Sequence, residues 1–203
     1  FKKLDNTQVK WVHYDIMDGH FVPNISVGSC ELSSLIKKTN IEIDIHFMVT
    51  NPDIIVPNFI KMFKNRKLKN ITVHAETCAD IKKLSKITRK NNIKFGLAIS
   101  PQSSIKRIIE NVEYIDLALI MTVKPGFAGQ DIITKCINKV KRLSKFFKEN
   151  NIDLPIQVDG GIKLKNISLL SDAGANIFVS GTGIFKTNNY KVTVDKMMKI
   201  INK

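Results

Sequence analysis

The sequence predicts a single α/β domain built as a (β/α)8 barrel, the TIM-barrel fold. Apolar runs rich in β-branched residues alternate along the chain with amphipathic helical patterns, which is typical of a parallel sheet covered by helices. Polar residues stand at the carboxyl ends of several runs, where barrel enzymes place their active sites. No Gly-x-Gly-x-x-Gly motif follows the first run, which disfavours the alternative, an open doubly wound sheet.

We expect seven strands, in chain order at residues 12–16, 41–49, 71–74, 95–99, 114–123, 156–158 and 177–179. Lysine-rich segments at residues 61–69, 81–90 and 137–148 have helical spacing. Residues 1–10 read as the end of a helix that leads into the first strand. We therefore expect residues 1–203 to form one N-terminally truncated barrel, which lacks the first strand and part of the first helix.

Composition places the chain among globular domains that bury one sizeable core. Its 203 residues are 43% hydrophobic, and no apolar run approaches the roughly 18 residues of a membrane span. The cysteines Cys30, Cys78 and Cys136 are odd in number and form no Cys-x-x-Cys pair. This argues against a disulfide framework or a structural zinc site and predicts a cytoplasmic protein.

The formal net charge of +14 makes nucleic-acid binding the alternative from another functional class. The lysines are spread, however, and recur between the apolar positions of the expected helices. We therefore expect a solvated basic surface, with no specific nucleic-acid partner and no membrane partner. Such a surface helps to attract an anionic substrate by long-range steering.

A metal site is predicted at the ends of three strands. His13 and Asp15 stand two residues apart in the first strand, so their side chains point to the same face. His46 lies near the end of the second strand, and Asp159 follows the sixth. Two imidazoles and two carboxylates would hold one divalent cation, Zn²⁺, Fe²⁺, Mn²⁺ or Co²⁺, and leave coordination positions for substrate oxygens.

Asp15 and Asp159 also predict a reaction. Carboxylates on opposite sides of a substrate can remove a proton from one face of a carbon and return one to the other face, which inverts that carbon. A cation between them would stabilise the enediolate that forms when a proton beside a carbonyl is removed. The residues therefore favour a two-base epimerisation.

Glycines follow the last three expected strands, in the segments PGFAGQ (125–130), DGG (159–161) and SGTG (180–183). Loops at these places commonly bind phosphate in barrels, because glycine lets backbone N–H groups approach an anion closely. A sugar phosphate is the obvious substrate. Near the same strand ends, Met17, Met48 and Met121 either pack in the core or line the pocket and exclude water.

Three further polar residues have simpler interpretations. His20 and His74 lack a second ligand at metal-binding spacing and are interpreted as structural hydrogen-bonding residues. Asp44 lies two residues before His46 on the same face. It either orients the ring of His46 or is an exposed carboxylate at the barrel rim.

From about Trp11 to Phe185 the chain resembles the ribulose-phosphate 3-epimerase family in several segments, in the family's order and spacing. They are HYDIMDGHFVPN (13–24), HFMV (46–49), MTVKPGFAGQ (121–130), VDGG (158–161) and VSG (179–181). The resemblance implies a metal-dependent interconversion of D-ribulose 5-phosphate and D-xylulose 5-phosphate in the pentose phosphate pathway. It also implies a homo-oligomer.

The resemblance assigns roles to individual residues. It implies His13, Asp15, His46 and Asp159 as metal ligands, with Asp15 and Asp159 as the acid and base. Met17, Met48 and Met121 match residues that line the family's pocket. The residues that match its substrate-binding positions are His46, Gly126, Phe127, Ala128, Gly129, Asp159, Gly160, Gly161, Gly181 and Thr182.

The chain departs from the family pattern at several points. Lys124 stands where the family usually has an acidic residue, and Ala128 where it often has glycine. The family's first strand, with a serine that contacts substrate, has no counterpart here. The PGFAGQ form also occurs in D-allulose-6-phosphate 3-epimerases, which makes that six-carbon sugar phosphate the alternative substrate. An inactive scaffold barrel is the other alternative.

Overall fold

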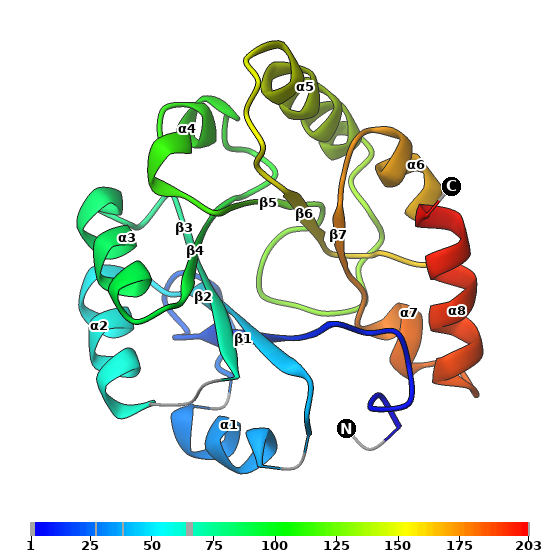
Figure 1. The fold of residues 1–203 in the computed structure, drawn as a ribbon, viewed down its shortest axis with the longest axis horizontal. Helices are drawn as coiled ribbons and strands as arrows, with labels where there is room; N and C mark the ends of the chain where they lie inside the picture. The colour runs from blue at the N-terminus through cyan, green and yellow to red at the C-terminus, as the bar shows by residue number, and fades with distance from the viewer. Residues whose placement is uncertain (1–2, 27, 38, 64–66, 203) are drawn as a thin grey trace.

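Seven parallel strands form a nearly closed barrel with helices around its outside in the computed structural model, which describes residues 3–26, 28–37, 39–63 and 67–202 (Figure 1). The strands are β1 (Trp11–Met17), β2 (Glu42–Met48), β3 (Leu68–His74), β4 (Lys94–Ile99), β5 (Leu117–Met121), β6 (Ile156–Asp159) and β7 (Ile177–Val179). The helices are α1 (Ser29–Ile36), α2 (Pro52–Met62), α3 (Ile81–Lys90), α4 (Lys106–Ile109), η1 (Val112–Tyr114), α5 (Lys135–Glu149), α6 (Ile167–Asp172), α7 (Thr182–Phe185) and α8 (Tyr190–Ile201).

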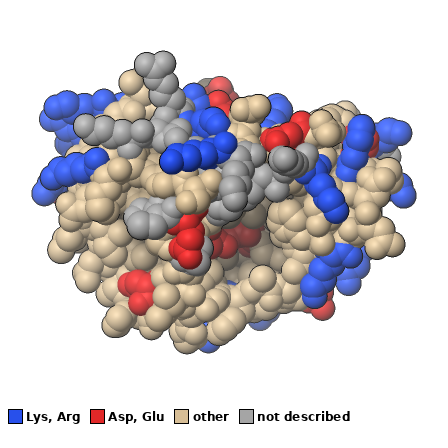
Figure 2. All heavy atoms as spheres, turned by 90° about the horizontal axis from the view of Figure 1, so that it is seen from below, with Lys and Arg blue, Asp and Glu red and all other residues tan. Residues whose placement is uncertain are grey.

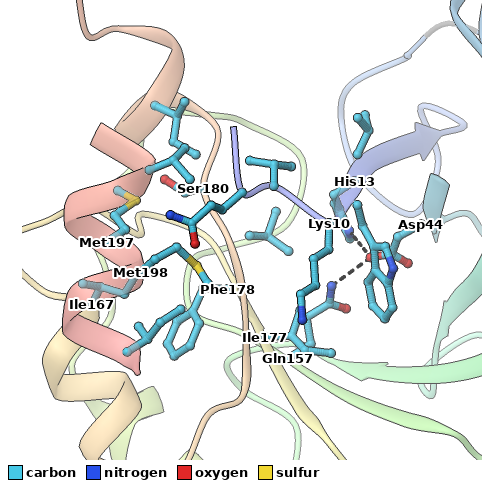
Figure 3. A pocket seen from close by; sticks show the side chains of 18 of the residues that line it. Lys10, His13, Asp44, Gln157, Ile167, Ile177, Phe178, Ser180, Met197 and Met198 are labelled. Atoms are coloured by element: carbon cyan, nitrogen blue, oxygen red, sulfur yellow. Dashed lines mark hydrogen bonds and ion pairs between the residues drawn. The ribbon is translucent and has the colours of Figure 1, made fainter. Parts of the chain in front are cut away.

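Each strand pairs in parallel with the next strand along the chain, in the order β1 to β7. Within the described ranges no ladder joins β7 to β1. We call this unpaired junction between β7 and β1 the seam. A cavity of about 470 Å³ lies along the seam, between β1 on one side and β7 and α8 on the other (Figure 3).

Side chains alternate along each strand between the helices outside and the barrel interior. Outward residues such as Ile43, Ile45 and Phe47 of β2 belong to the main apolar core under the helices. The interior has two unlike halves. Leucines, Met121 and Val123 gather around β5, whereas the buried interior side chains of β2, β3 and β6 include Asp44, His46, Asn70, Thr72, His74 and Gln157. The polar half therefore needs internal hydrogen bonds.

Three element boundaries differ from the sequence prediction. Residues 3–8 are turns and bends rather than a helix, because the backbone N–H and the hydroxyl of Thr7 both bond to the carbonyl of Leu4 and close a turn. Residues 61–69 do not form one helix. Helix α2 ends at Met62, residues 64–66 lie outside the described part, and β3 already begins at Leu68, whose side chain is buried.

The fifth strand is shorter than predicted. Tyr114 ends η1, and Asp116 holds the chain before the strand by accepting the backbone N–H of Phe95 at 2.9 Å. The strand itself spans Leu117–Met121. The other predicted strands and the lysine-rich helices at 81–90 and 137–148 agree with the structure to within three residues at each end.

On the face that Figure 2 draws, basic side chains are spread rather than gathered in one patch. Figure 2 shows Lys and Arg side chains spread over one face of the molecule, with acidic side chains near its centre. Cys78 and Cys136 are free thiols, and the side chain of Cys30 lies outside the described part of the structure. Across the residues described, no helix has the length and apolar character needed to cross a bilayer.

Candidate metal centre

The four predicted ligands lie together at the barrel mouth. His13 and Asp15 point inward from β1, and the β1–β2 register places Asp15 beside His46. Asp159 approaches from the end of β6. One ligand atom from each residue lies within 4.8 Å of all the others. Two neighbouring strands, β1 and β2, and β6 near the other end of the sheet thus direct two imidazoles and two carboxylates to a common centre.

The atoms that face this centre are defined by their short separations. Asp15 Oδ1 lies 3.3 Å from His13 Nε2 and 3.2 Å from His46 Nδ1. Asp159 Oδ2 lies 3.9 Å and 3.8 Å from the same two nitrogens. His13 Nε2 is buried and has no hydrogen-bond partner among the described residues. An unpartnered ring nitrogen among two carboxylates fits a divalent cation bound by nitrogen and oxygen ligands.

Asp44 orients His13, not His46 as we expected. Its Oδ2 lies 2.7 Å from His13 Nδ1, so that Nε2 of the same ring turns toward the cluster. Asp44 is fully buried and also accepts a hydrogen bond from the side-chain amide of Asn70 at 2.7 Å. It accepts another from the side-chain amide of Gln157 at 2.8 Å (Figure 3). The alternative of an exposed rim carboxylate is wrong as well, because β1 and β6 enclose this side chain.

His74 has a closer connection to the cluster than its sequence suggested. Its Nε2 lies 3.0 Å from His46 Nε2, and its Nδ1 lies 3.1 Å from Glu76 Oε2. Glu76 was not singled out from the sequence. The available signal was its position two residues after a histidine at a strand end. His20, in contrast, is exposed, and its Nδ1 lies 2.9 Å from the carbonyl oxygen of Asp18.

The two cluster carboxyl groups have opposite pKa shifts. Burial alone would raise the pKa of Asp15, but the close contacts of its carboxylate with His13 and His46 outweigh burial and bring that pKa below its usual range. Burial, and then the negative charge of Asp15, raise the pKa of Asp159 to about 7. Near neutral pH, therefore, the cluster contains one ionised carboxylate and one carboxyl group that readily carries a proton.

The imidazoles also differ. Burial alone would lower the pKa of His13, but the charge of Asp44, the contact with Asp15 and the hydrogen bond to Asp44 raise it well above its usual value. For His46 burial dominates and lowers the pKa to about 4. His46 is therefore neutral at physiological pH, with one ring nitrogen free to act as a metal ligand.

The three glycine-rich loops meet beside the cluster. A Cβ atom added at Gly129 would lie 4.0 Å from Thr182, and one added at Gly161 would lie 2.9 Å from the backbone oxygen of Gln130. Gly126, Gly129, Gly160 and Gly161 all have positive φ, between 70° and 115°. Phe127 and Ala128 are exposed at the tip of the first loop. The structure thus brings the predicted substrate-binding positions into one rim of the barrel.

Other predicted residues line or flank this region. Met17, Met48 and Met121 end β1, β2 and β5, and the last two are almost fully buried. The side-chain amide of Asn24 donates to the carbonyl of Gly126 at 2.7 Å and ties the loop after β1 to the loop after β5. Lys124 is exposed, and its carbonyl accepts a hydrogen bond from Gln130.

The fold and the cluster define a class of protein, a parallel β/α barrel able to hold a divalent cation between two carboxylates at the mouth. The model of the "Ribulose-phosphate 3 epimerase family" matches residues 1–185. The chain belongs to the ribulose-phosphate 3-epimerase family. It is therefore an isomerase, and the family implies a small-molecule sugar phosphate as substrate.

Relatives with the name ribulose-phosphate 3-epimerase support this assignment. The protein of Buchnera aphidicola subsp. Acyrthosiphon pisum is 38% identical over 200 residues, which cover 98% of this chain and 86% of the relative. The protein of Escherichia coli strain K12 is 34% identical over 187 residues, with 92% of this chain and 81% of the relative covered.

Solved structures are similar in fold. The 3-hexulose-6-phosphate synthase of Salmonella typhimurium has a TM-score of 0.65 at 13% identity and covers 96% of this chain and 99% of its own. The thiamine phosphate pyrophosphorylase of Pyrococcus furiosus has a TM-score of 0.64 at 10% identity and covers 99% of this chain and 87% of its own. At these identities the likeness concerns the barrel fold alone.

Proposed function

We propose that the protein interconverts D-ribulose 5-phosphate and D-xylulose 5-phosphate in the pentose phosphate pathway by two-base proton exchange at C3. The observation that carries the proposal is the convergence of Asp15 and Asp159 on one centre, with their pKa values shifted in opposite directions. One base must be ionised while the opposing acid holds a proton, and the two environments provide this difference.

The residues divide the reaction between them. Asp15, ionised, removes the proton from one face of C3, and Asp159 delivers a proton to the opposite face; the reverse reaction exchanges these roles. His13 and His46 hold the Asp15 carboxylate in place through their contacts of 3.3 and 3.2 Å with its Oδ1. Met48 and Met121, both buried, limit the access of water to the reacting carbon.

His13, Asp15, His46 and Asp159 would hold the divalent cation, which we expect to be Zn²⁺, Fe²⁺, Mn²⁺ or Co²⁺. When bound, the cation supplies positive charge beside the substrate oxygens, acidifies the neighbouring C–H and stabilises the enediolate. Asp44 keeps Nε2 of His13 directed at the cluster.

The three glycine-rich loops, at residues 125–130, 159–161 and 180–183, would bind the phosphate group. The positive-φ glycines of the first two loops, and the open space beside Gly181 in the third, allow backbone N–H groups to approach an anion. We further propose a cytoplasmic location, because Cys78 and Cys136 are free thiols, and a homo-oligomer, on the basis of the family resemblance. Fractionation and sedimentation of the protein test these two points.

The two-base mechanism is tested with Asp159→Asn. We expect this variant to fold and to lose about 10²–10⁴-fold in turnover, the range for loss of a general acid or base. Solvent deuterium should enter C3 of the product more slowly by the same factor. Asp131→Asn, at an exposed position, is the matched control. Undiminished turnover of Asp159→Asn would contradict the mechanism, and higher kcat/KM on D-allulose 6-phosphate than on D-ribulose 5-phosphate would favour the six-carbon substrate.

A further inference from the structure

A chain of hydrogen-bonding groups leads away from the candidate metal centre through β3. His46 Nδ1 faces Asp15 and Asp159, so its other nitrogen, Nε2, points away from the centre. That nitrogen lies 3.0 Å from His74 Nε2. His74 Nδ1 in turn lies 3.1 Å from Glu76 Oε2. Both imidazole rings are fully buried, so water does not replace these contacts.

The direction of the hydrogen bonds from His46 through His74 to Glu76 is fixed by the cation at one end and the carboxylate at the other. A cation requires the lone pair of His46 Nδ1, so a neutral His46 must carry its proton on Nε2. This N–H then donates to His74 Nε2, which requires the proton of His74 to sit on Nδ1. That proton faces a carboxylate oxygen of Glu76, which is an acceptor. Each of these groups therefore has a matching donor or acceptor only when Glu76 accepts a hydrogen bond from His74.

Glu76 and His74 are themselves held firmly. The other carboxylate oxygen of Glu76, Oε1, accepts the backbone N–H of Ser100 at 2.8 Å and a short hydrogen bond from the hydroxyl of Ser103. Lys139 of α5 donates to the carbonyls of Ser100 and Pro101 and so fixes this loop. The ring of Phe21 packs on His74, with centroids 4.6 Å apart.

We propose that His74 and Glu76 are positioning residues that hold His46 in the tautomer with its proton on Nε2 and thereby present Nδ1 to the cation. This proposal rests on the metal site of the proposed function. It assigns a role to two residues that are not cation ligands. It also explains why a buried histidine and a half-buried carboxylate lie beside the cluster without facing its centre.

The sharpest test is Glu76→Gln. Ser100 and Ser103 both donate to Oε1, so the single amide oxygen of glutamine stays there and its NH₂ group turns toward His74. His74 Nδ1 must then accept, His74 Nε2 carries the proton, and His46 is driven to place its own proton on Nδ1, where the cation binds. The hydrogen-bond direction is reversed with almost no change in shape.

We expect Glu76→Gln to bind Co²⁺ about 10–100-fold more weakly than the unaltered protein, as measured by optical titration against a competing chelator. In the absence of metal, the urea concentration at the midpoint of unfolding should be nearly the same for Glu76→Gln and for the unaltered protein. Glu149→Gln, the same substitution at an exposed position on α5, is the matched control and should leave Co²⁺ affinity unchanged.

A second measurement does not depend on the variant. In ¹⁵N-labelled unaltered protein with one equivalent of Zn²⁺, we expect the histidine spectra to place protons on His46 Nε2 and His74 Nδ1. A proton on His74 Nε2, or an unchanged Co²⁺ affinity in Glu76→Gln, would overturn the proposal. If the unaltered protein binds no Co²⁺, the metal site of the proposed function fails too. Cation binding without epimerase activity would count against the proposed function alone.

Discussion

Asp44 shows how a single buried carboxylate determines the state of a metal ligand. It accepts hydrogen bonds from Asn70 and Gln157 and pairs with His13, so its negative charge is balanced by protein groups inside the barrel. The same charge raises the pKa of His13, as described above. Asp44, which does not face the cation, therefore influences how strongly a proton on His13 competes with the cation.

Competition between protons and cation gives a prediction at the residue scale. A proton on His13 Nε2, or on the Asp159 oxygen that faces the centre, competes with the cation, and the pKa values of both groups are raised. Protons must leave as the cation binds, so affinity should rise with pH. We expect about a tenfold gain in Co²⁺ affinity per pH unit for each proton displaced, between about pH 6 and pH 8.

The measurement is a Co²⁺ titration at several pH values in buffers that do not bind metal. Calorimetry in two buffers of different ionisation enthalpy counts the released protons independently. An affinity that does not change over this range would show that neither His13 nor Asp159 carries a proton that the cation displaces.

The sequence predicted which four side chains converge, because the period of a strand places His13 and Asp15 on one face and polar residues mark strand ends. The partners of the histidines could not be predicted. The contact of Asp44 with His13 depends on the β1–β2 register, and Glu76 is held by Ser100, on a loop 24 residues further along. Register between strands is a tertiary property that a single-strand pattern does not contain.

At the scale of elements, the strands were predictable and their ends less so. Strands buried on both faces produce near-continuous apolar runs, which are easily recognised. The errors lie where a side chain closes a turn, as with Thr7, or where lysine spacing concealed the alternation of Leu68 and its neighbours. The glycine-rich loops were predicted from composition, whereas their mutual contact depends on the closure of the sheet.

A set of glycine-to-alanine variants tests the loops. Gly181 has negative φ, and an added Cβ would meet only open space, so Gly181→Ala should change unfolding free energy by no more than about 0.5 kcal/mol. If backbone groups here approach the phosphate, the KM for the sugar phosphate should rise about tenfold or more, the effect of losing a hydrogen bond to a charged group. Unfolding and steady-state kinetics are the two measurements.

Two matched variants separate strain from binding. Gly160 has a φ of 113°, and an added Cβ would collide with Val123, so Gly160→Ala should lose about 1–3 kcal/mol of stability. Gly28 has open space around it and lies outside the three loops, so Gly28→Ala should alter neither quantity. An unchanged KM in Gly181→Ala would argue against close approach of the phosphate at this residue.

At the scale of the whole molecule, the net charge of +14 is a property of the surface rather than of the site. Spread positive charge attracts a phosphate dianion over distances that salt limits, about 30 Å at 0.01 M and about 8 Å at 0.15 M. We expect kcat/KM to fall by roughly tenfold between these ionic strengths, with kcat nearly constant. Initial rates at several salt concentrations measure this, and a kcat/KM that is independent of salt would exclude steering.

The position of the cluster at the seam gives it a structural role as well as a chemical one. His13, Asp15 and His46 belong to the wall on one side of the unpaired junction, whereas Asp159 belongs to β6, which with β7 forms the wall on the other. An ion bound by all four would cross-link the two walls where the described backbone provides no ladder. Metal binding would then hold the β1 and β7 sides of the open barrel together. Removal of the metal by a chelator would let these two sides separate before any helix unfolds.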